Sequence, residues 1–408
     1  MNGGRGRCRS ALVLALIAAG ATVFGSASGA ATPSPPCSTE PGAPLFELVY
    51  LLQPGEERIT ARTRRRAAAV LCERLRRIGG GDAEIRLQGR RHMRVLLPRR
   101  LRGGTVQRVA DRLAVPGQLG FYDWEADLIG PERAIGGHPG KAPKASALAR
   151  AEREWKEAGR STHDPAEARL IFAGAFPRAY GAVRLASQRG ARKHCRACSA
   201  STPRFYMFDR SASHRLIAGP VSNRAALHRG ERRNNIVLKV PVGTVIVSEQ
   251  PANGLGELLT ESEPGWFALR DRPALTAADI VDPKQEIDEL GQPAVTFGFT
   301  QRGRTAFQRV TREIAQCGQA EAIGPVAVEE AEALSCHLAV ILDGEVKTRA
   351  IINFADNPDG IDGRVGAQIA GGFTTVRDAR NLAAILRTGA LPIELTLVGQ
   401  RALRAQNS

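Results

Sequence analysis

The chain has 408 residues, of which 57 are basic and 41 acidic, so its formal net charge is +16. This length allows two or three domains, and a hydrophobic fraction of 43% is sufficient for packed cores. The positive charge favours acidic partners or acidic lipid headgroups, although a solvated arginine-rich surface is the commoner explanation. Beyond the N-terminus no stretch approaches the length of a transmembrane helix, so the sequence predicts no further span.

The N-terminus resembles an export signal. Three arginines precede the apolar run ALVLALIAAGATVF, and small residues follow, with a cleavage position after Ala30. The alternative is an uncleaved anchor, because no charged residue interrupts positions 10–39. Residues 1–31 are predicted to be a signal peptide or membrane anchor, and the proline-rich residues 32–43 a linker. We therefore expect an exported, extracytoplasmic chain, membrane-anchored or secreted, and no nucleic-acid partner.

Residues 44–125 alternate short strands and helices. Strands are predicted at 45–52, 83–89, 92–98 and 117–125, and helices at 56–78 and 105–114. In the first helix Val70, Leu71, Leu75 and Ile78 share one face. Such short alternating units indicate an α+β sandwich.

The next segment, residues 126–233, is rich in Ala, Arg, Gly and Ser and is predicted to be mostly irregular. Within it we predict a polar helix at 146–159 and a strand at 204–210. Three strands follow, NIVLKV at 235–240, GTVIVSE at 243–249 and AVTFGFT at 294–300. We expect all three strands to present edges or apolar grooves to an extended polypeptide.

A helix is predicted over 305–318, with Gly318 as its stop. Residues 337–352 indicate a β-hairpin, because Asp343 and Gly344 suit the two positive-φ positions of a tight turn.

The C-terminal part predicts a helix followed by a strand. Thr375 and Asp378 form a capping box, Gly389 ends the helix, and Pro392 prevents it from resuming. The alternation in IELTLV, residues 393–398, is typical of a half-buried strand.

Several of these motifs together resemble the protein-export membrane protein SecD. In chain order they are DRPALT, GQPAV, FTQRGRTAF, LAVILDGEV, GAQIAGGFT (with Gly371 and Gly372) and NLAAILRTGALP. The resemblance covers about residues 45–125 and 265–400 and concerns the large extracytoplasmic domain. In the family the GALP strand leads into a second membrane helix and a helical bundle. We expect this chain to lack that bundle and its proton path.

The resemblance implies an α+β fold in which a ferredoxin-like base subdomain carries an inserted, mixed α+β head. We assign the base to residues 44–125 and 372–400, the head to 126–371, and a tail to 401–408. The family's head is thought to hold emerging preprotein by non-covalent contacts, so no catalytic residue, cofactor or metal is implied. The expected partners are unfolded exported polypeptide and Sec translocase components, and the expected role is a stand-alone, non-enzymatic module in protein export.

The cysteines suit an exported chain. After signal removal an even number remains, namely Cys37, Cys72, Cys195, Cys198, Cys317 and Cys336. We predict that Cys317 pairs with Cys336, because they flank one inserted loop between a helix end and a hairpin strand. The segment KHCRAC lacks a second cysteine pair at zinc-finger spacing, and its surroundings do not indicate the helix start of a thioredoxin-like motif.

Two other classes of function stay open on the sequence. A diverged SecD paralogue would serve as a structural envelope or secreted protein with no export role. An exported thiol-redox enzyme would use Cys195 and Cys198, and free thiols of low pKa would indicate it. The run RTRRR at 62–66 lies on the outer face of a predicted helix. A solvated face is its commoner explanation, and contact with a membrane surface is the alternative.

Overall fold

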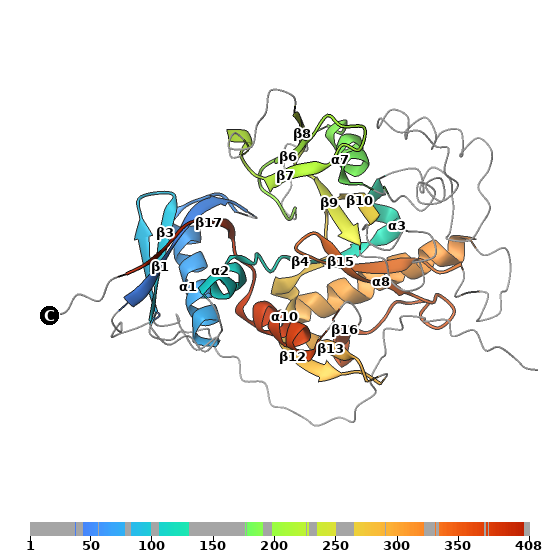
Figure 1. Cartoon of the computed structure of the whole chain (residues 1–408). Coiled ribbons are helices and arrows are strands. Elements are labelled where there is room, and N and C mark those ends of the chain that lie inside the picture. The colour runs from blue at the N-terminus through green and yellow to red at the C-terminus, as the bar shows by residue number, and fades with distance from the viewer. Residues whose placement is uncertain are drawn as a thin grey trace, which may run out of the picture.

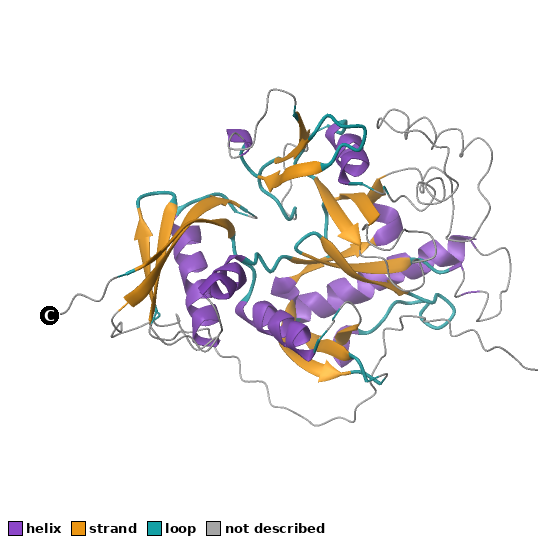
Figure 2. Cartoon of the chain, viewed as in Figure 1, coloured by secondary structure: helices purple, strands orange, loops and turns teal. Residues whose placement is uncertain are grey.

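A computed structural model describes most of the chain from Pro44 to Leu403. The described residues are 37, 44–55, 57–77, 83–98, 106–129, 176, 178–190, 198–225, 227, 235–249, 265–289, 291–321, 331, 334–370, 373 and 375–403. They form an α+β fold with four sheets (Figure 2). In this part of the chain, no helix combines the length and the apolar character needed to cross a bilayer.

A four-stranded antiparallel sheet with the order β17-β1-β3-β2 forms one body of the molecule (Figure 1). Its elements are β1 (Pro44–Pro54), α1 (Ala61–Arg77), β2 (Glu84–Gln88), β3 (His92–Pro98), α2 (Val106–Ala114) and β17 (Ile393–Ala402). They follow one another as β-α-β-β-α-β, the order of elements in the ferredoxin-like motif. All other described elements are inserted between α2 and β17.

Helices α1 and α2 share one core with this sheet. Leu48, Tyr50 and Leu52 alternate along β1, and each is almost fully buried together with Leu75 of α1. The Tyr50 hydroxyl donates to the carbonyl oxygen of Ala110 in α2 at 3.0 Å, so the buried phenol has a partner.

A seven-stranded sheet in the order β11-β4-β14-β15-β9-β10-β5 lies at the centre of the inserted part (Figure 1). Its strands are β4 (Leu119–Asp123), β5 (Leu128–Ile129), β9 (Thr244–Glu249), β10 (Gly265–Arg270), β11 (Leu275–Thr276), β14 (His337–Leu342) and β15 (Glu345–Ile351). The hairpin between β14 and β15 turns at Asp343 and Gly344, with φ values of 52° and 83°. These positive values are the ones a tight hairpin requires, as predicted.

A third sheet, β12-β13-β16, packs with the two longer helices of the inserted part. These elements are β12 (Ile280–Ile287), β13 (Pro293–Phe299), β16 (Ala367–Ala370), α8 (Gln301–Glu321) and α10 (Val376–Thr388). Val295, Phe297 and Phe299 of β13 are buried, which confirms the predicted alternation. Phe299 stacks on Phe307 of α8 with ring centroids 4.6 Å apart, and Phe121 of β4 joins the same core.

The fourth sheet, β7-β6-β8, lies with α7 at the top of Figure 1. Its elements are β6 (Arg204–Phe208), β7 (Leu216–Val221), β8 (Ile236–Val240) and α7 (Ala179–Ser187). Short helical turns complete the description: α3 (Trp124–Asp127), η2 (Ala277–Asp279) and η3 (Gly363–Val365). Segment 126–233 is therefore more regular than predicted where it is described. The polar helix predicted at 146–159 lies outside the described residues, as do Gly371 and Gly372.

The prediction that Gly318 ends a helix is wrong, because α8 continues to Glu321. Gly318 is buried inside the helix, where a Cβ atom would lie 2.7 Å from the Phe354 ring and 3.0 Å from the Cα of Ser335. The glycine therefore permits a close approach between chain segments and does not stop the helix.

Residues 372–400 comprise a helix and a strand that pack on different sheets. Strand β17 pairs with β1, whereas α10 packs on β12 and β13 and buries Leu382 and Leu386 in the core that contains Phe299. The capping box of Thr375 and Asp378 is present as predicted, and the helix ends at Gly389, where φ is 84°. We propose that the second part of the base begins after this glycine and that α10 belongs to the inserted head.

Candidate polypeptide-binding edge

A folded protein can bind an extended polypeptide as an added strand on an open sheet edge, so the outer strands are candidate sites. The outer strands of the four sheets are β2, β5, β7, β8, β11, β12, β16 and β17. Proteins usually protect such edges with proline, bulges, charged side chains or very short strands. Whether an edge can accept an added strand therefore depends on which of these protective features it has.

Most of these edges are protected. Strand β12 contains Pro283 beside a register shift, and β7 contains Pro220 and shifts register twice against β6. Strand β17 has a register shift in its pairing with β1, and β2 carries the ion pair of Glu84 and Arg86. Strands β5 and β11 have two residues each, and β16 has four. None of these strands offers a long, regular and apolar edge.

Strand β8 has none of these protective features apart from one lysine. Its five residues pair with β6 in continuous register, from Val240 opposite Arg204 to Ile236 opposite Phe208. Four of the five side chains are aliphatic, and only Lys239 is exposed. No described strand pairs with the other side of β8. An extended chain laid along β8 would meet free backbone groups between apolar side chains.

The expectation was that three strands present edges or apolar grooves, and its part about edges is wrong for two of them. GTVIVSE forms β9, which lies between β15 and β10, and AVTFGFT forms β13, which lies between β12 and β16. Strand β13 is paired along both sides, whereas β9 is paired along its length with β10 and with β15 only at Ser248 opposite Glu345. NIVLKV forms β8 and is the one that lies at an edge.

A packed core holds β8 in place. Val240 of β8 and Phe208 of β6 are buried in a cluster shared with α7. Tyr180 of α7 meets Phe208 edge to face, with ring centroids 5.2 Å apart. Because α7 packs on this strand, the exposed edge belongs to a rigid element.

The same sheet is tied to the base. Arg204 at the start of β6 forms an ion pair with Glu394 of β17 at 2.5 Å. The hydroxyl of Ser222 donates to the side-chain oxygen of Gln53 in β1 at 3.1 Å. Burial raises the pKa of Glu394, and the positive charge of Arg204 opposes that shift. These contacts join the sheet β7-β6-β8 to strands β1 and β17 of the base.

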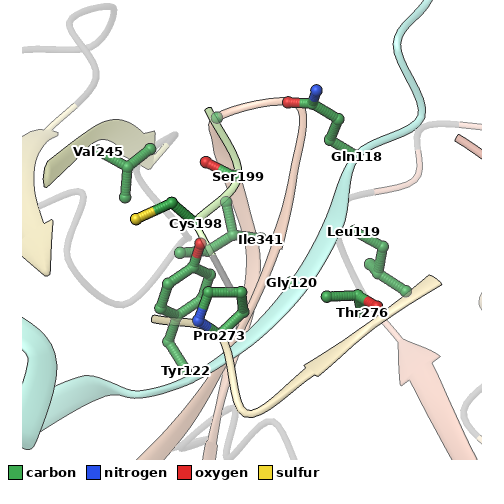
Figure 3. Close-up of a pocket in the computed structure, with 11 residues that line it drawn as sticks. Gln118, Leu119, Gly120, Tyr122, Cys198, Ser199, Val245, Pro273, Thr276 and Ile341 are labelled. Carbon is green, nitrogen blue, oxygen red and sulfur yellow. The ribbon is translucent and has the colours of Figure 1, made fainter. Parts of the chain in front are cut away.

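The pocket drawn in Figure 3 is lined in part by Tyr122 and Ser199. Both residues bind the buried carboxylate of Asp271. Ser199 donates its backbone N–H at 2.9 Å and its hydroxyl at 3.0 Å to Asp271, and the Tyr122 hydroxyl donates to the same carboxylate at 3.3 Å. Burial raises the pKa of Asp271, which is 2% exposed. The volume is about 70 Å³, far below that of a typical ligand site, so the network is structural.

The described cysteines are in disulfides. The predicted Cys317–Cys336 bond is present, with Cα atoms 6.0 Å apart, and Cys37 is bonded to Cys72 with Cα atoms 4.9 Å apart. Cys198 is also disulfide-bonded, whereas Cys195 lies outside the described residues. A bonded Cys198 is inert toward metals and electrophiles, so its role in this state is structural.

A carboxylate lies beside one of these disulfides. Glu125 approaches the sulfurs of Cys317 and Cys336, and it accepts hydrogen bonds from the backbone N–H of His337 at 2.8 Å. Both sulfurs are bonded to each other, so the group offers no thiolate to a metal ion.

Arg74 joins the two connections between the base and the inserted part. Its side chain is 6% exposed and donates to the carbonyl oxygens of Leu113, Val115 and Pro116 on the outgoing connection and of Gly389 on the returning one. The role of Arg74 was not predicted from the sequence. The available signal was its position three residues after Leu71, on the buried face of α1.

The titration of Asp123 should make the free energy of unfolding depend on pH. It caps α3, where its Oδ1 accepts from the N–H of Ala126 at 2.9 Å, and burial raises its pKa to about 6. Because the folded pKa exceeds the unfolded value, the carboxyl stabilises the fold most at low pH, and this contribution is lost as pH rises from about 4 to 6.

The Asp123→Asn variant keeps the cap and does not titrate. Its free energy of unfolding relative to wild type should rise by about 2–3 kcal/mol between pH 4 and 7 in urea titrations. A difference that stays constant with pH would contradict this prediction.

The comparisons with known proteins agree on one family. The model described as "SecDF, P1 head subdomain" matches residues 256–393. The protein translocase subunit SecDF of Thermus thermophilus is 31% identical over 131 residues, which are 32% of this chain and 14% of that protein. The protein translocase subunit SecD of Aquifex aeolicus is 29% identical over 136 residues, which are 33% of this chain and 22% of that protein. Strand β8 lies outside the matched range.

Solved SecDF structures also align with the chain. A crystal structure of SecDF in a super-membrane-facing form gives a TM-score of 0.42 at 20% identity, covering 91% of this chain and 32% of that one. A structure of SecDF, described as a membrane component that enhances protein export, gives 0.40 at 19% identity, covering 88% and 100%. The sequence matches carry this comparison: residues 256–393 match the SecDF P1 head subdomain, and the matched part, which spans less than a quarter of either relative, is similar to SecD and SecDF.

Proposed function

We propose that this chain is a SecD-like extracytoplasmic module that binds unfolded exported polypeptide during protein export and works without catalysis. The binding site we assign is the outer edge of β8. The relatives are named as protein translocase subunits, which supports a role beside the Sec translocase. The observation that carries the proposal is the open, regular and apolar edge of β8 in a molecule whose other outer strands are protected.

Strand addition suits a protein that must hold many clients. The backbone N–H and C=O groups of β8 would pair with the client backbone, which every sequence shares. The half-buried side chains Ile236, Val237 and Leu238 would add apolar contact with little dependence on the client sequence. Ordering a disordered client offsets much of this gain, so we expect affinities in the micromolar range or weaker.

The client backbone provides the first test. We expect the full chain to bind a labelled, extended apolar peptide of about ten residues, and a scrambled peptide of the same composition within about threefold. Methylation of several successive backbone nitrogens of the peptide should weaken binding by at least about tenfold, because each lost backbone hydrogen bond contributes about 1 kcal/mol. Fluorescence anisotropy measures both effects. Equal binding of the N-methylated peptide would contradict strand addition.

A matched pair of protein variants provides the second test. Val237→Glu places a charge on the β8 edge, and Val398→Glu places one on the outer strand β17 of the base. We expect the first variant to bind the peptide at least about fivefold more weakly and the second to bind as wild type does. Weaker binding by Val398→Glu and unchanged binding by Val237→Glu would assign the site to the base instead. Absence of binding by wild type would favour a structural role with no part in export.

A further inference from the structure

Six arginines lie at the end of the base where α1 begins and β2 turns into β3. They are Arg58, Arg62, Arg64 and Arg65 at the start of α1, and Arg90 and Arg91 in the turn between β2 and β3. We call this surface the arginine face. All its members are exposed except Arg64, which is half-buried because its guanidinium donates to the carbonyl oxygen of Gly89 in that turn. This hydrogen bond holds the helix start against the hairpin.

Nearby acids do not neutralise the arginine face. Glu57 pairs with Arg66 and Glu84 pairs with Arg86, so both carboxylates are engaged elsewhere. No member of the face forms an ion pair with a described residue. Within the described part of the chain, the five exposed guanidinium groups therefore present positive charge to solvent without an acidic partner.

Helix stability does not explain this arrangement. The first turn of α1 contains no acidic residue, and arginines occupy the helix start instead. The positive end of the helix dipole lies there, so basic side chains at this end are unfavourable. Packing does not explain it either, because Arg62 and Arg65 point away from the core formed by Leu71 and Leu75. An exposed basic cluster that serves neither helix stability nor packing is available for binding an anionic partner.

The chain also limits how far the arginine face lies from the N-terminal apolar segment. The disulfide between Cys37 and Cys72 fixes the linker to the middle of α1. The residues between Phe24, where the apolar run ends, and Cys37 can span at most about 45 Å even when fully extended. A bilayer that holds the apolar segment is therefore within reach of α1.

We propose that the arginine face docks on the anionic phospholipid headgroups of a bilayer. Guanidinium groups match phosphodiester oxygens as bidentate donors, and they keep their charge at every physiological pH. The contact would orient α1 and the β2–β3 turn toward the membrane. The client-binding edge β8 belongs to a different sheet.

Arginine-selective footprinting of the full chain tests this proposal. The chain is reconstituted in phosphatidylcholine vesicles with either no or about 30% phosphatidylglycerol, modified with phenylglyoxal and mapped by mass spectrometry. We expect modification of Arg62, Arg65, Arg90 and Arg91 to slow roughly fivefold in the anionic vesicles and to recover at about 0.5 M salt. Arg377 and Arg380, which are exposed on α10, should react equally in both vesicles. Equal reactivity of the arginine face in both vesicles would overturn the proposal, as would equal protection of the α10 arginines.

A pair of full-length variants separates specific docking from general attraction. In R62Q/R65Q/R90Q/R91Q, protection of the remaining Arg58 and Arg64 by anionic vesicles should be lost. In the charge-matched control R304Q/R312Q/R377Q/R380Q, that protection should remain. Loss in both variants would show that net charge alone drives binding. Protection by soluble glycerol phosphate or an acidic peptide to the same degree as by vesicles would assign the face to a soluble anion and overturn the membrane contact.

Discussion

Replacing Arg74 with alanine should lower the free energy of unfolding by about 3–5 kcal/mol, because the change leaves several buried carbonyl oxygens without a donor. Burial lowers the pKa of Arg74 to about 10, and the negative charge of Asp343 opposes that shift, so the guanidinium stays charged at neutral pH. Arg74→Lys should recover only part of the loss, since one ammonium cannot serve carbonyls on both connections.

The neighbouring Arg77 is the matched control for this prediction. Arg77 lies on the same helix, is about one third exposed and pairs with Glu73 at 2.7 Å. Arg77→Ala should change the free energy of unfolding by less than about 1 kcal/mol, as is usual for exposed ion pairs. Urea titrations monitored by circular dichroism compare the variants. Equal effects of Arg74→Ala and Arg77→Ala would contradict the proposed role of Arg74 at the connections.

Removing the disulfide between Cys317 and Cys336 should also lower the free energy of unfolding substantially. The double variant Cys317→Ala/Cys336→Ala should lose about 3 kcal/mol, because the bond closes a loop with a sequence separation of 19 and restricts the unfolded chain. Cys336 is fully buried and Cys317 lies beside the core that contains Phe354, so alanine leaves only a small void. Thermal unfolding of the double variant and of wild type measures the loss.

Two controls make the disulfide prediction specific. Wild type unfolded under reducing conditions should approach the stability of the double variant, whereas the double variant should respond less to reductant. Mass mapping after non-reducing digestion should find the two peptides joined. Free thiols at both positions in oxidised protein, or an unchanged stability of the double variant, would contradict the prediction.

Local signals in the sequence predicted most of the elements correctly. The capping box at Thr375 and Asp378, the stop at Gly389 and the hairpin at Asp343 and Gly344 depend on residues a few positions apart, and each is present. The Cys317–Cys336 bond was also predictable, because a helix end and a hairpin strand bring the two residues together. Such features are fixed by backbone conformations that few residue types favour.

Long-range pairing could not be predicted in the same way. The alternation in β9, β13 and β8 reports that one face of each strand is buried, but it does not report which strands lie beside it. For the same reason the capping box and apolar stripe of α10 do not report that the helix packs on β12 and β13. The prediction that Gly318 ends a helix was wrong, because the sequence does not distinguish a glycine needed for close packing from one that ends a helix.

Hydrogen exchange of the full chain with and without an unfolded client tests the central claim most directly. Strand addition would engage the outward backbone groups of β8, so amides within Ile236–Val240 should exchange more slowly when the client is bound. Amides of β17, a longer outer strand, should exchange at the same rate in both states. Protection confined to β17 or to the base, with β8 unchanged at saturating client, would contradict the assignment of the binding edge.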